Sequence, residues 1–439
     1  MSFSKDFLWG VASASAQIEG GWNEDGRTAS IWDNVPKGKV KNDETCRVAC
    51  DHYHRWKQDV ALMKEIGVKS YRFSLSWSRI MPERGSINPE GVSFYRNLIM
   101  ELKKNDIEPL VTIYHWDLPL WADKQGGWLS EKIIDLFAEY TKAVVDSFSD
   151  LVRYWIVINE PQCFIMNGYM TGVHAPFKHR YLALPKLTRN CLRAVHKAVD
   201  IIRENAKTKP IIGTTMAASA FVPESEEPEA IEKARIDSFS KGIGLMNNQW
   251  WCAPLFEGKQ VSAYGIYHTG RKYLEDIRTE FDFIGLNVYS PFQDNWYGTN
   301  ETLPPEKKNL LGWVNDGRCL YWAIRFFNER YHLPIMITEN GLCDADIVSE
   351  DGKVHDKKRI AYMEDYLTNL KRAVDEGYPV LGYQYWSVMD NFEWVEGYEP
   401  RYGLIYIDYK DQRRILKDSA FYYRDIITGN GKNIGASEK

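Results

Sequence analysis

The chain of 439 residues contains few cysteines, and they form no pattern. There are seven, an odd number, and no CxxC motif occurs. This argues against a disulfide framework and against a structural zinc site of paired cysteines. The run from Cys46 to His54 holds two cysteines and two histidines, but no second ligand cluster with matching spacing accompanies it. We therefore expect two buried thiols there and no metal.

Long apolar runs and blocks of like charge are also missing. Lys and Arg number 55 and Asp and Glu number 60, which gives a formal net charge of −5. A mildly acidic chain without a basic stripe does not suit a nucleic-acid partner. No stretch is long enough to span a membrane, and residues 1–17 lack the apolar core of a signal peptide. We expect a cytoplasmic protein; whether it forms a homo-oligomer stays open.

Short apolar or β-branched runs recur along the chain with amphipathic stretches between them. Helical spacing of apolar residues marks 54–67, which ends on Gly67, and also 92–106 and 359–377. Four of the apolar runs open with proline, which suits the first position of a strand. The eight runs begin at Phe7, Ser70, Pro109, Tyr154, Pro210, Phe281, Pro334 and Pro379.

Eight alternations of strand and helix predict an α/β protein with a (β/α)8 TIM barrel. A doubly wound open sheet is the rival, but no GxGxxG motif follows the first run. No linker rich in Gly, Ser or Pro and no internal repeat is visible, so we expect residues 1–439 to form a single domain. The segments 171–190, 217–262 and 291–317 are longer than minimal connections, and we interpret them as elaborated loops.

Polar and aromatic residues gather at the ends of these predicted strands. In a (β/α)8 barrel, the carboxyl ends of the strands and the loops after them build the active site. The residues found there are Gln17, Arg72, His115, Trp116, Asn159, Glu160, Asn287, Tyr289, Glu339, Trp386, Glu393 and Trp394. Amides and carboxylates can bind sugar hydroxyls, while indole faces stack on the C–H side of a sugar ring.

Two of these residues are glutamates that each end an apolar strand. Glu160 follows "YWIVIN", and Glu339 lies in "IMITENG". Carboxyls on two strands of one barrel mouth can flank a single bond, and glycoside cleavage needs one protonated and one ionised carboxyl. Their separation, which sequence does not give, decides between retention and inversion. The plainer alternative is that either glutamate is only a helix-capping or ion-pair residue.

With these residues assembled, the chain resembles glycoside hydrolase family 1, the β-glucosidases and their relatives. The resemblance covers nearly the whole chain. The motifs that carry it are "FLWGVASASAQIEGGWNEDGRTASIWD", "ACDHYHRWKQDV", "YRFSLSWSRIMP", "IYHWDLPLW", "INEP", "FIGLNVYS", "ITENG" and "YWSVMDNFEWVEGYEPRYGLIYID". The resemblance implies a retaining β-glycosidase, most simply a β-glucosidase acting on β-glucosides through a covalent glycosyl-enzyme, with no cofactor and no metal.

The resemblance also implies roles for individual residues. Glu160 would be the general acid/base, with a pKa raised by the nearby charge of Glu339, and Glu339 the nucleophile. Arg72 and Tyr289 would orient the nucleophile, and Trp313 would line the entrance for the leaving group. The implied sugar-binding residues are Gln17, His115, Trp116, Asn159, Asn287, Trp386, Glu393, Trp394 and Tyr402.

Three positions depart from the family's usual pattern. Gln162 stands where a Trp often follows Asn-Glu-Pro, so stacking on a flat leaving group would be weaker or relocated. Phe177 replaces a common Gly and would reshape a loop that brings 178–180 near the entrance. Tyr402 replaces the usual Phe and is frequent in relatives that cleave sugar 6-phosphates. Those relatives use Ser where this chain has Glu393, whose charge would repel a phosphate.

Three hypotheses of function remain from the sequence. The first is a retaining β-glucosidase that acts on a free sugar. The second is a 6-phospho-β-glucosidase, which Tyr402 alone suggests. The third is a sugar-binding protein without activity, which should lack one of the two carboxylates, whereas this chain has both.

Overall fold

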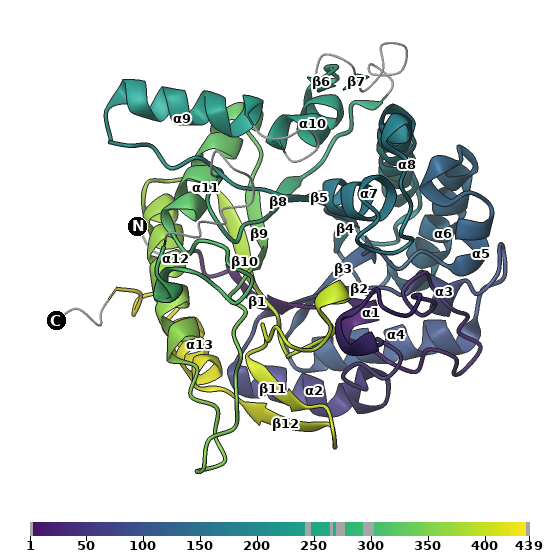
Figure 1. The fold of residues 1–439 in the computed structure, drawn as a ribbon, viewed down its shortest axis with the longest axis horizontal. Coiled ribbons are helices and arrows are strands. Elements are labelled where there is room, and N and C mark those ends of the chain that lie inside the picture. The colour runs from purple at the N-terminus through teal and green to yellow at the C-terminus, as the bar shows by residue number, and fades with distance from the viewer. Residues whose placement is uncertain (1–2, 242–246, 264–266, 269–276, 293–302, 436–439) are drawn as a thin grey trace.

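The computed structural model describes residues 3–241, 247–263, 267–268, 277–292 and 303–435. Eight parallel strands form a closed barrel in the order β1-β10-β9-β8-β5-β4-β3-β2, and β1 closes it by pairing with both β2 and β10 (Figure 1). The barrel strands are β1 (Leu8–Ala12), β2 (Ser70–Ser74), β3 (Glu108–Tyr114), β4 (Tyr154–Asn159), β5 (Ile211–Ala217), β8 (Phe283–Asn287), β9 (Ile335–Asn340) and β10 (Val380–Trp386).

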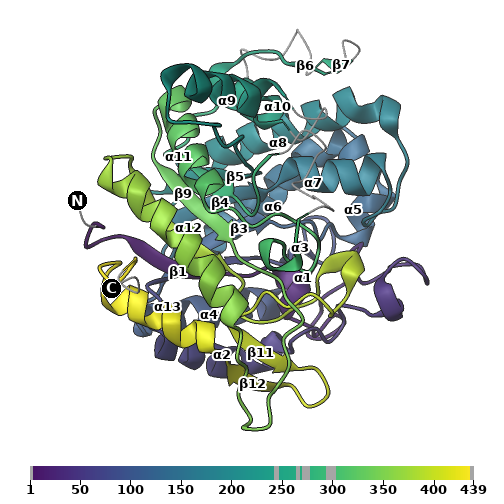
Figure 2. The same cartoon turned by 60° about the vertical axis from the view of Figure 1, so that its left-hand side comes forward.

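Long helices surround the strands (Figures 1 and 2). They are α2 (His52–Ile66), α4 (Pro89–Lys104), α6 (Lys132–Phe148), α8 (Leu184–Asn205), α9 (Pro228–Ser240), α11 (Arg318–Tyr331), α12 (Lys357–Asp375) and α13 (Asp418–Thr428). The short helices are α1 (Ser15–Ile18), α3 (Trp77–Ile80), α5 (Leu120–Lys124), α7 (Pro161–Ile165) and α10 (Asn248–Cys252). The (β/α)8 barrel predicted from the sequence is confirmed.

Local sequence signals fix several boundaries. Gly67 ends α2 in the left-handed region, with φ of 81°, and its N–H donates to the last carbonyls of the helix. The Asn88 side chain caps α4 by accepting from the Glu90 N–H, and Pro89 occupies the first helical position. Of the four prolines expected to open strands, Pro109 is the second residue of β3, and the other three immediately precede their strands.

The segments interpreted as elaborated loops contain more helix than expected. The stretch 171–190 runs into α8, which begins at Leu184, and 217–262 contains α9 and α10. Part of 291–317 lies outside the described residues. Two small hairpins complete the fold, β6 (Ser262–Ala263) with β7 (Tyr267–His268), and β11 (Ile405–Asp408) with β12 (Arg413–Leu416).

The inside of the barrel is filled by side chains rather than open. Leu110, Ile156, Phe283 and Met336, from β3, β4, β8 and β9, form one fully buried cluster. Gly213 on β5 makes room for it, because a Cβ there would lie 2.4 Å from the Phe283 ring. The interior is therefore a packed core with no channel, and only the mouth of the barrel is free to build a site.

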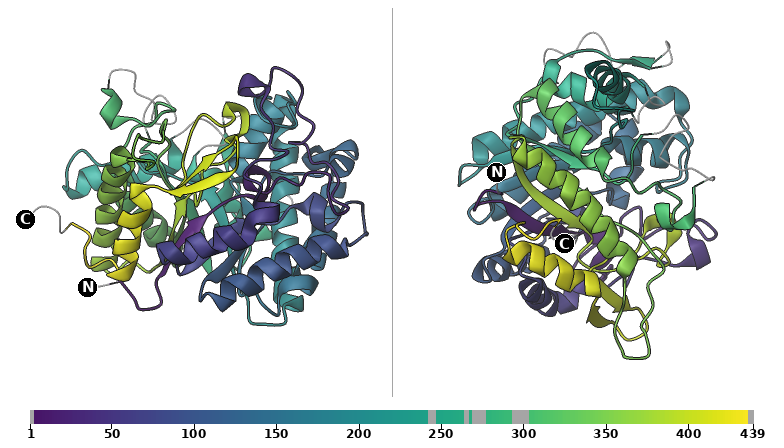
Figure 3. Two further views of the ribbon diagram at one scale, coloured as in Figure 1. Left: turned by 90° about the horizontal axis from the view of Figure 1, so that it is seen from below. Right: turned by 90° about the vertical axis from the view of Figure 1, so that its left-hand side faces the viewer.

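The last helices fasten the two ends of the chain together. Helices α12 and α13 run side by side on the outside of the barrel (Figure 3). The Tyr423 hydroxyl donates to the Gly10 carbonyl on β1, and Trp9 donates to the Asn430 side chain at 2.9 Å. Within the described ranges, none of the helices has the length and apolarity needed to cross a membrane.

The packed interior leads to a prediction about stability. We expect Ile156→Ala to lower the free energy of unfolding by about 2–5 kcal/mol, because it leaves a cavity between side chains that are fully buried. Ile347→Ala is the matched control, since that side chain is 74% exposed, and it should change the value by less than about 0.5 kcal/mol. Urea denaturation followed by tryptophan fluorescence measures both. Equal effects of the two substitutions would contradict a solid barrel interior.

Candidate active site

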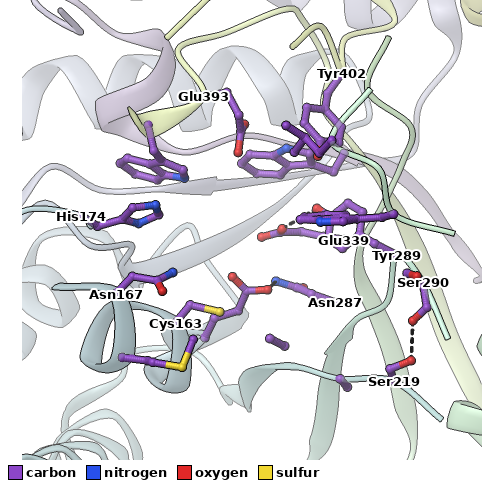
Figure 4. A pocket seen from close by; sticks show the side chains of 18 of the residues that line it. Cys163, Asn167, His174, Ser219, Asn287, Tyr289, Ser290, Glu339, Glu393 and Tyr402 are labelled. Carbon is purple, nitrogen blue, oxygen red and sulfur yellow. Dashed lines mark hydrogen bonds between the residues drawn. The ribbon is translucent and has the colours of Figure 1, made fainter. Parts of the chain in front are cut away.

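A cavity of about 640 Å³ opens at the carboxyl ends of the barrel strands (Figure 4). Most of the site residues expected from the sequence line it, and Gln17, Arg72 and Asn159 do not. These three are buried directly behind the lining and bond to residues within it. The expected residues that line the cavity are His115, Trp116, Glu160, Asn287, Tyr289, Trp313, Glu339, Trp386, Glu393, Trp394 and Tyr402.

Glu160 stands at a sharp turn between β4 and α7. Its φ of 43° lies in the left-handed region, which is unusual for a residue with a side chain, and Pro161 starts the helix after it. Its carboxyl accepts from the Asn287 amide at 2.9 Å and from the Asn159 amide at 3.4 Å. Burial, and then the charge of Glu339, raise the pKa of Glu160 to about 8. The carboxyl therefore keeps its proton at neutral pH.

Glu339, at the end of β9, has strong donors on both carboxylate oxygens. The Arg72 guanidinium donates to Oε1 at 2.6 Å, and the Tyr289 hydroxyl donates to Oε2 at 2.7 Å. Burial raises the pKa of Glu339, while the Arg72 charge and these hydrogen bonds oppose that rise. Of the two acids, Glu339 is thus the one whose ionised form is supported by a cation.

Two asparagines connect the acids. Asn159 Oδ1 accepts from Arg72 at 2.7 Å and from Asn287 at 3.1 Å. Asn287 donates to Glu160, and its hydrogen bonding also lowers the pKa of Glu339, its register partner on the neighbouring strand. Asn287 therefore acts on both carboxyls, and the charge of Glu339 acts on Glu160, so the two acids face the same part of the cavity.

Aromatic rings form another wall of the cavity. The Trp394 ring lies 4.8 Å from Trp116 and 4.6 Å from Trp32, and the His115 ring stacks 5.8 Å from Trp386. Burial and the charge of Arg72 lower the pKa of His115 well below its usual range, so its imidazole is neutral. The wall therefore presents flat apolar faces beside uncharged polar edges.

Glu393 adds a third carboxyl to the cavity. Burial, followed by the charges of Glu339 and Glu160, raises its pKa to about 8. The Gln17 amide donates to it at 3.3 Å and also to the Asn391 side chain and the Phe392 carbonyl. Gln17 thereby holds the loop that presents Glu393 to the cavity.

Buried ion pairs close this loop at its base. Asp390 accepts from Lys417 at 2.6 Å, from Arg401 at 2.7 Å and from the Gly403 N–H at 2.9 Å. Asp390 and Lys417 are fully buried, and Lys417 also pairs with Asp346, beyond β9. Asp390, at the start of the segment that carries Glu393 and Trp394, thus binds Arg401 and Gly403 at the end of that segment.

Sequence reasoning missed the outer part of the cavity. Strand β5 carries no distinctive polar residue at its end, and no motif marks the turns after α7. The rule that the loops after barrel strands build the active site could still have pointed to both segments. The lining residues missed are Cys163, Met166, Asn167, His174, Ala217, Ala218, Ser219, Ser290, Pro291, Phe292, Leu311, Val395 and Glu396.

The departures from the family pattern fall mostly outside the cavity. Gln162 is buried and donates to the Ala217 carbonyl at 3.0 Å, so it does not take the place of an indole in the lining. Phe177 packs near Trp32, and Lys178 pairs with Asp123. None of residues 178–180, which were expected near the entrance, lines the cavity itself.

No group of three or more metal-ligating side chains occurs in the part of the chain that the structure describes. Cys46 and Cys50 are buried free thiols, as expected. His52 pairs with Asp59, and His54 pairs with two other carboxylates.

Comparison with known proteins agrees with this geometry. The family model for glycosyl hydrolase family 1 matches residues 1–432. The 1,4-beta-D-glucan glucohydrolase of Thermotoga neapolitana is 41% identical over 98% of this chain and 99% of its own length, and beta-glucosidase A of Thermotoga maritima is 40% identical over 98% of both. The structure of a Thermotoga maritima beta-glucosidase in complex with glucoimidazole matches with a TM-score of 0.88 and 39% identity, covering 98% of this chain and 99% of that one. The chain belongs to glycosyl hydrolase family 1.

Proposed function

We propose that this protein is a retaining β-glucosidase that removes terminal β-D-glucosyl residues through a covalent glycosyl-enzyme. The observation that carries the proposal is the asymmetry of the two acids. The raised pKa of Glu160 keeps its carboxyl protonated, whereas hydrogen bonds from Arg72 and Tyr289 stabilise the anion of Glu339. Both acids interact with Asn287, and this shared neighbour supports the close spacing of a retaining pair, about 5 Å, over that of an inverting pair, which needs room for water.

In the first step, the Glu160 carboxyl donates its proton to the glycosidic oxygen. The bond between that oxygen and the anomeric carbon breaks, and Glu339 forms a bond to the carbon from the opposite face. Arg72 and Tyr289 hold the Glu339 carboxylate in position for this attack. The leaving group departs as an alcohol.

In the second step, Glu160 is a carboxylate and acts as the base. It takes a proton from water, and the resulting hydroxide attacks the anomeric carbon and displaces Glu339. While the ester exists, Glu339 carries no negative charge. It therefore no longer raises the pKa of Glu160, and Glu160 ionises more readily. Two inversions give overall retention.

The sugar itself is proposed to lie between Trp386, Trp394 and Glu393, with Trp313 at the entrance. The other residues proposed to surround it are Gln17, His115, Trp116, Asn159 and Asn287.

A sugar 6-phosphate is not favoured in this cavity. The described lining contains no Lys or Arg, so a phosphate dianion would be buried there without a counter-ion. The Tyr402 hydroxyl, which alone suggested a phosphate, is engaged with Cys343.

Substituting each acid separately tests the two roles. In Glu339→Gly with azide and 2,4-dinitrophenyl β-glucoside, azide enters the space of the lost carboxyl, so we expect α-glucosyl azide. In Glu160→Gly, azide attacks the glycosyl-enzyme instead, so we expect β-glucosyl azide. Each variant without azide should lose activity by at least about 10³-fold on substrates with poor leaving groups. NMR of the products distinguishes the anomers, and the same anomer from both variants would exclude the assignment.

The pKa of Glu160 predicts the alkaline limb of the pH profile. Since the first step needs the protonated acid, kcat/KM for an alkyl β-glucoside should fall as pH rises past about 8. Glu160→Gln with a 2,4-dinitrophenyl glucoside, whose leaving group needs no proton, should lose that alkaline fall. Initial rates between pH 5 and 10 measure both profiles. An unchanged limb in the variant would assign it to another group.

Selectivity against phosphate gives a further prediction. We expect kcat/KM for 4-nitrophenyl β-glucoside to exceed that for its 6-phosphate by at least about 100-fold, because no Lys or Arg of the described lining compensates the burial of the dianion. The ratio should widen as pH rises past about 8, where Glu393 ionises and adds like charge, and the isosteric variant Glu393→Gln should not show that widening. Preference for the 6-phosphate in the unmodified protein would instead make it a 6-phospho-β-glucosidase.

A further inference from the structure

The loops that follow β9 and β10 share one chain of ion pairs behind the cavity. The loop after β9 runs on from Glu339, and the loop after β10 carries Glu393 and Trp394 into the cavity. The charged side chains that join these loops are 0 to 14% exposed, so water screens them little. They are Asp346, Asp356, Asp390, Arg359, Arg401 and Lys417.

Lys417 is the junction of this chain of ion pairs. Its ammonium donates to Asp390 Oδ1 at 2.6 Å, at the start of the loop that carries Glu393, and to Asp346 Oδ2, in the loop after β9. Lys417 itself follows β12, and its N–H donates to the Leu404 carbonyl at 2.9 Å. One fully buried side chain therefore connects three segments that lie apart in the sequence.

The far end of the Glu393 loop is fastened separately. Asp344 and Arg401 pair through their backbones, each N–H donating to the carbonyl of the other at 3.1 Å. Asp390, by contrast, lies three residues before Glu393, and its carboxylate is the one that Lys417 ties to the loop after β9. Lys417 therefore acts on the end of the loop that is nearer to Glu393.

The carboxyl of Glu393 depends on its loop for its position. Among the described residues, it accepts one hydrogen bond, from the Gln17 amide at 3.3 Å. A single long hydrogen bond holds a carboxyl weakly. The loop itself has little slack near Asp390, because a Cβ on Gly403 would lie 2.0 Å from the Asp390 nitrogen. A shift of Asp390 would therefore be passed on to Glu393.

The charge of Lys417 keeps the two loops together. Asp346 and Asp390 accept from the same ammonium, so their carboxylates lie close and would repel each other without it. Burial and the charge of Arg359 lower the pKa of Lys417, while the two aspartates oppose that fall. The ammonium and the two carboxylates thus depend on one another for their charged forms.

We propose that Lys417 is a positioning residue for the reaction. By tying Asp390 to the loop after β9, it sets the distance between Glu339, which attacks the anomeric carbon, and Glu393, which holds the rest of the sugar. This inference rests on the proposed β-glucosidase function and extends it to a residue that does not line the cavity. Lys417 touches no substrate and acts through the loop of Glu393.

The first test separates positioning from stability. We expect Lys417→Met to raise KM for 4-nitrophenyl β-glucoside about tenfold and to change kcat less than about threefold, because Glu160 and Glu339 keep their own contacts. The Tm should fall, since two buried carboxylates lose a counter-ion. Adding Asp346→Asn rebalances the charge without restoring the tie, so Tm should recover while KM stays raised.

A matched control lowers stability without touching the ion pairs. Leu136 is buried in α6, a helix that contributes no residue to them. We expect Leu136→Ala to lower Tm and to leave KM within about twofold. Thermal unfolding and initial rates measure both quantities for each variant. Should Lys417→Met alone not fold, the charge-balanced double variant carries the same comparison.

The second test asks whether Lys417 acts through Glu393. In Glu393→Ala the contact with the sugar is already lost, so moving the loop has less left to remove. There Lys417→Met should lower kcat/KM for 2,4-dinitrophenyl β-glucoside by about threefold or less, against about tenfold in the unmodified background. Effects that simply multiply in the double variant would show that Lys417 does not act through this loop.

The outcomes separate this inference from the proposed function. If the unmodified protein cleaves neither aryl glucoside, the proposed function fails and the positioning role falls with it. If it cleaves them but KM is unchanged in Lys417→Met, or returns to normal together with Tm in the charge-balanced variant, the function stands and the positioning role is overturned. The second result would show that Lys417 serves stability alone.

Discussion

Arg72 is the residue on which the geometry of the site depends. Its guanidinium, fully buried at the mouth of the barrel, bonds to Thr112, Asn159, Thr338 and Glu339, so it links β2 to β3, β4 and β9. Removing one partner of a buried ion pair leaves an uncompensated charge, which typically costs about 3–5 kcal/mol. The pairing of Arg72 with Glu339 therefore fixes the nucleophile candidate and supports its ionised form at the same time.

The two acids differ because their neighbours differ. Both are buried, and burial alone would raise the pKa of each. Glu339 has a cation and a phenol as donors. Among the described residues, Glu160 has neutral amides and a thiol as hydrogen-bond partners, and the negative charge of Glu339 raises its pKa further. Environment thus divides two chemically identical side chains into a proton donor and an anion, which is the requirement for retaining glycoside cleavage.

The outer cavity and the loop that carries Glu393 depend on contacts between distant parts of the chain. Asp390 and Lys417 close the loop of Glu393, although Lys417 lies beyond the β11–β12 hairpin. On the other side, the segment after α7 carries Asn167 and His174 against two indoles. No local sequence pattern predicts either arrangement, because both depend on how the loops pack on the barrel.

The sequence by itself determined the barrel and placed two glutamates at its mouth. Eight apolar runs, with helical periodicity between them, have only one closed parallel arrangement, and strand ends such as Glu160 and Glu339 must share its mouth. What only the tertiary structure decided was which residues border the cavity: it placed Gln17 behind Glu393, turned Gln162 away and brought Asn167 and His174 in. Strand periodicity is encoded locally, whereas the direction of a loop side chain depends on contacts between residues far apart in the chain.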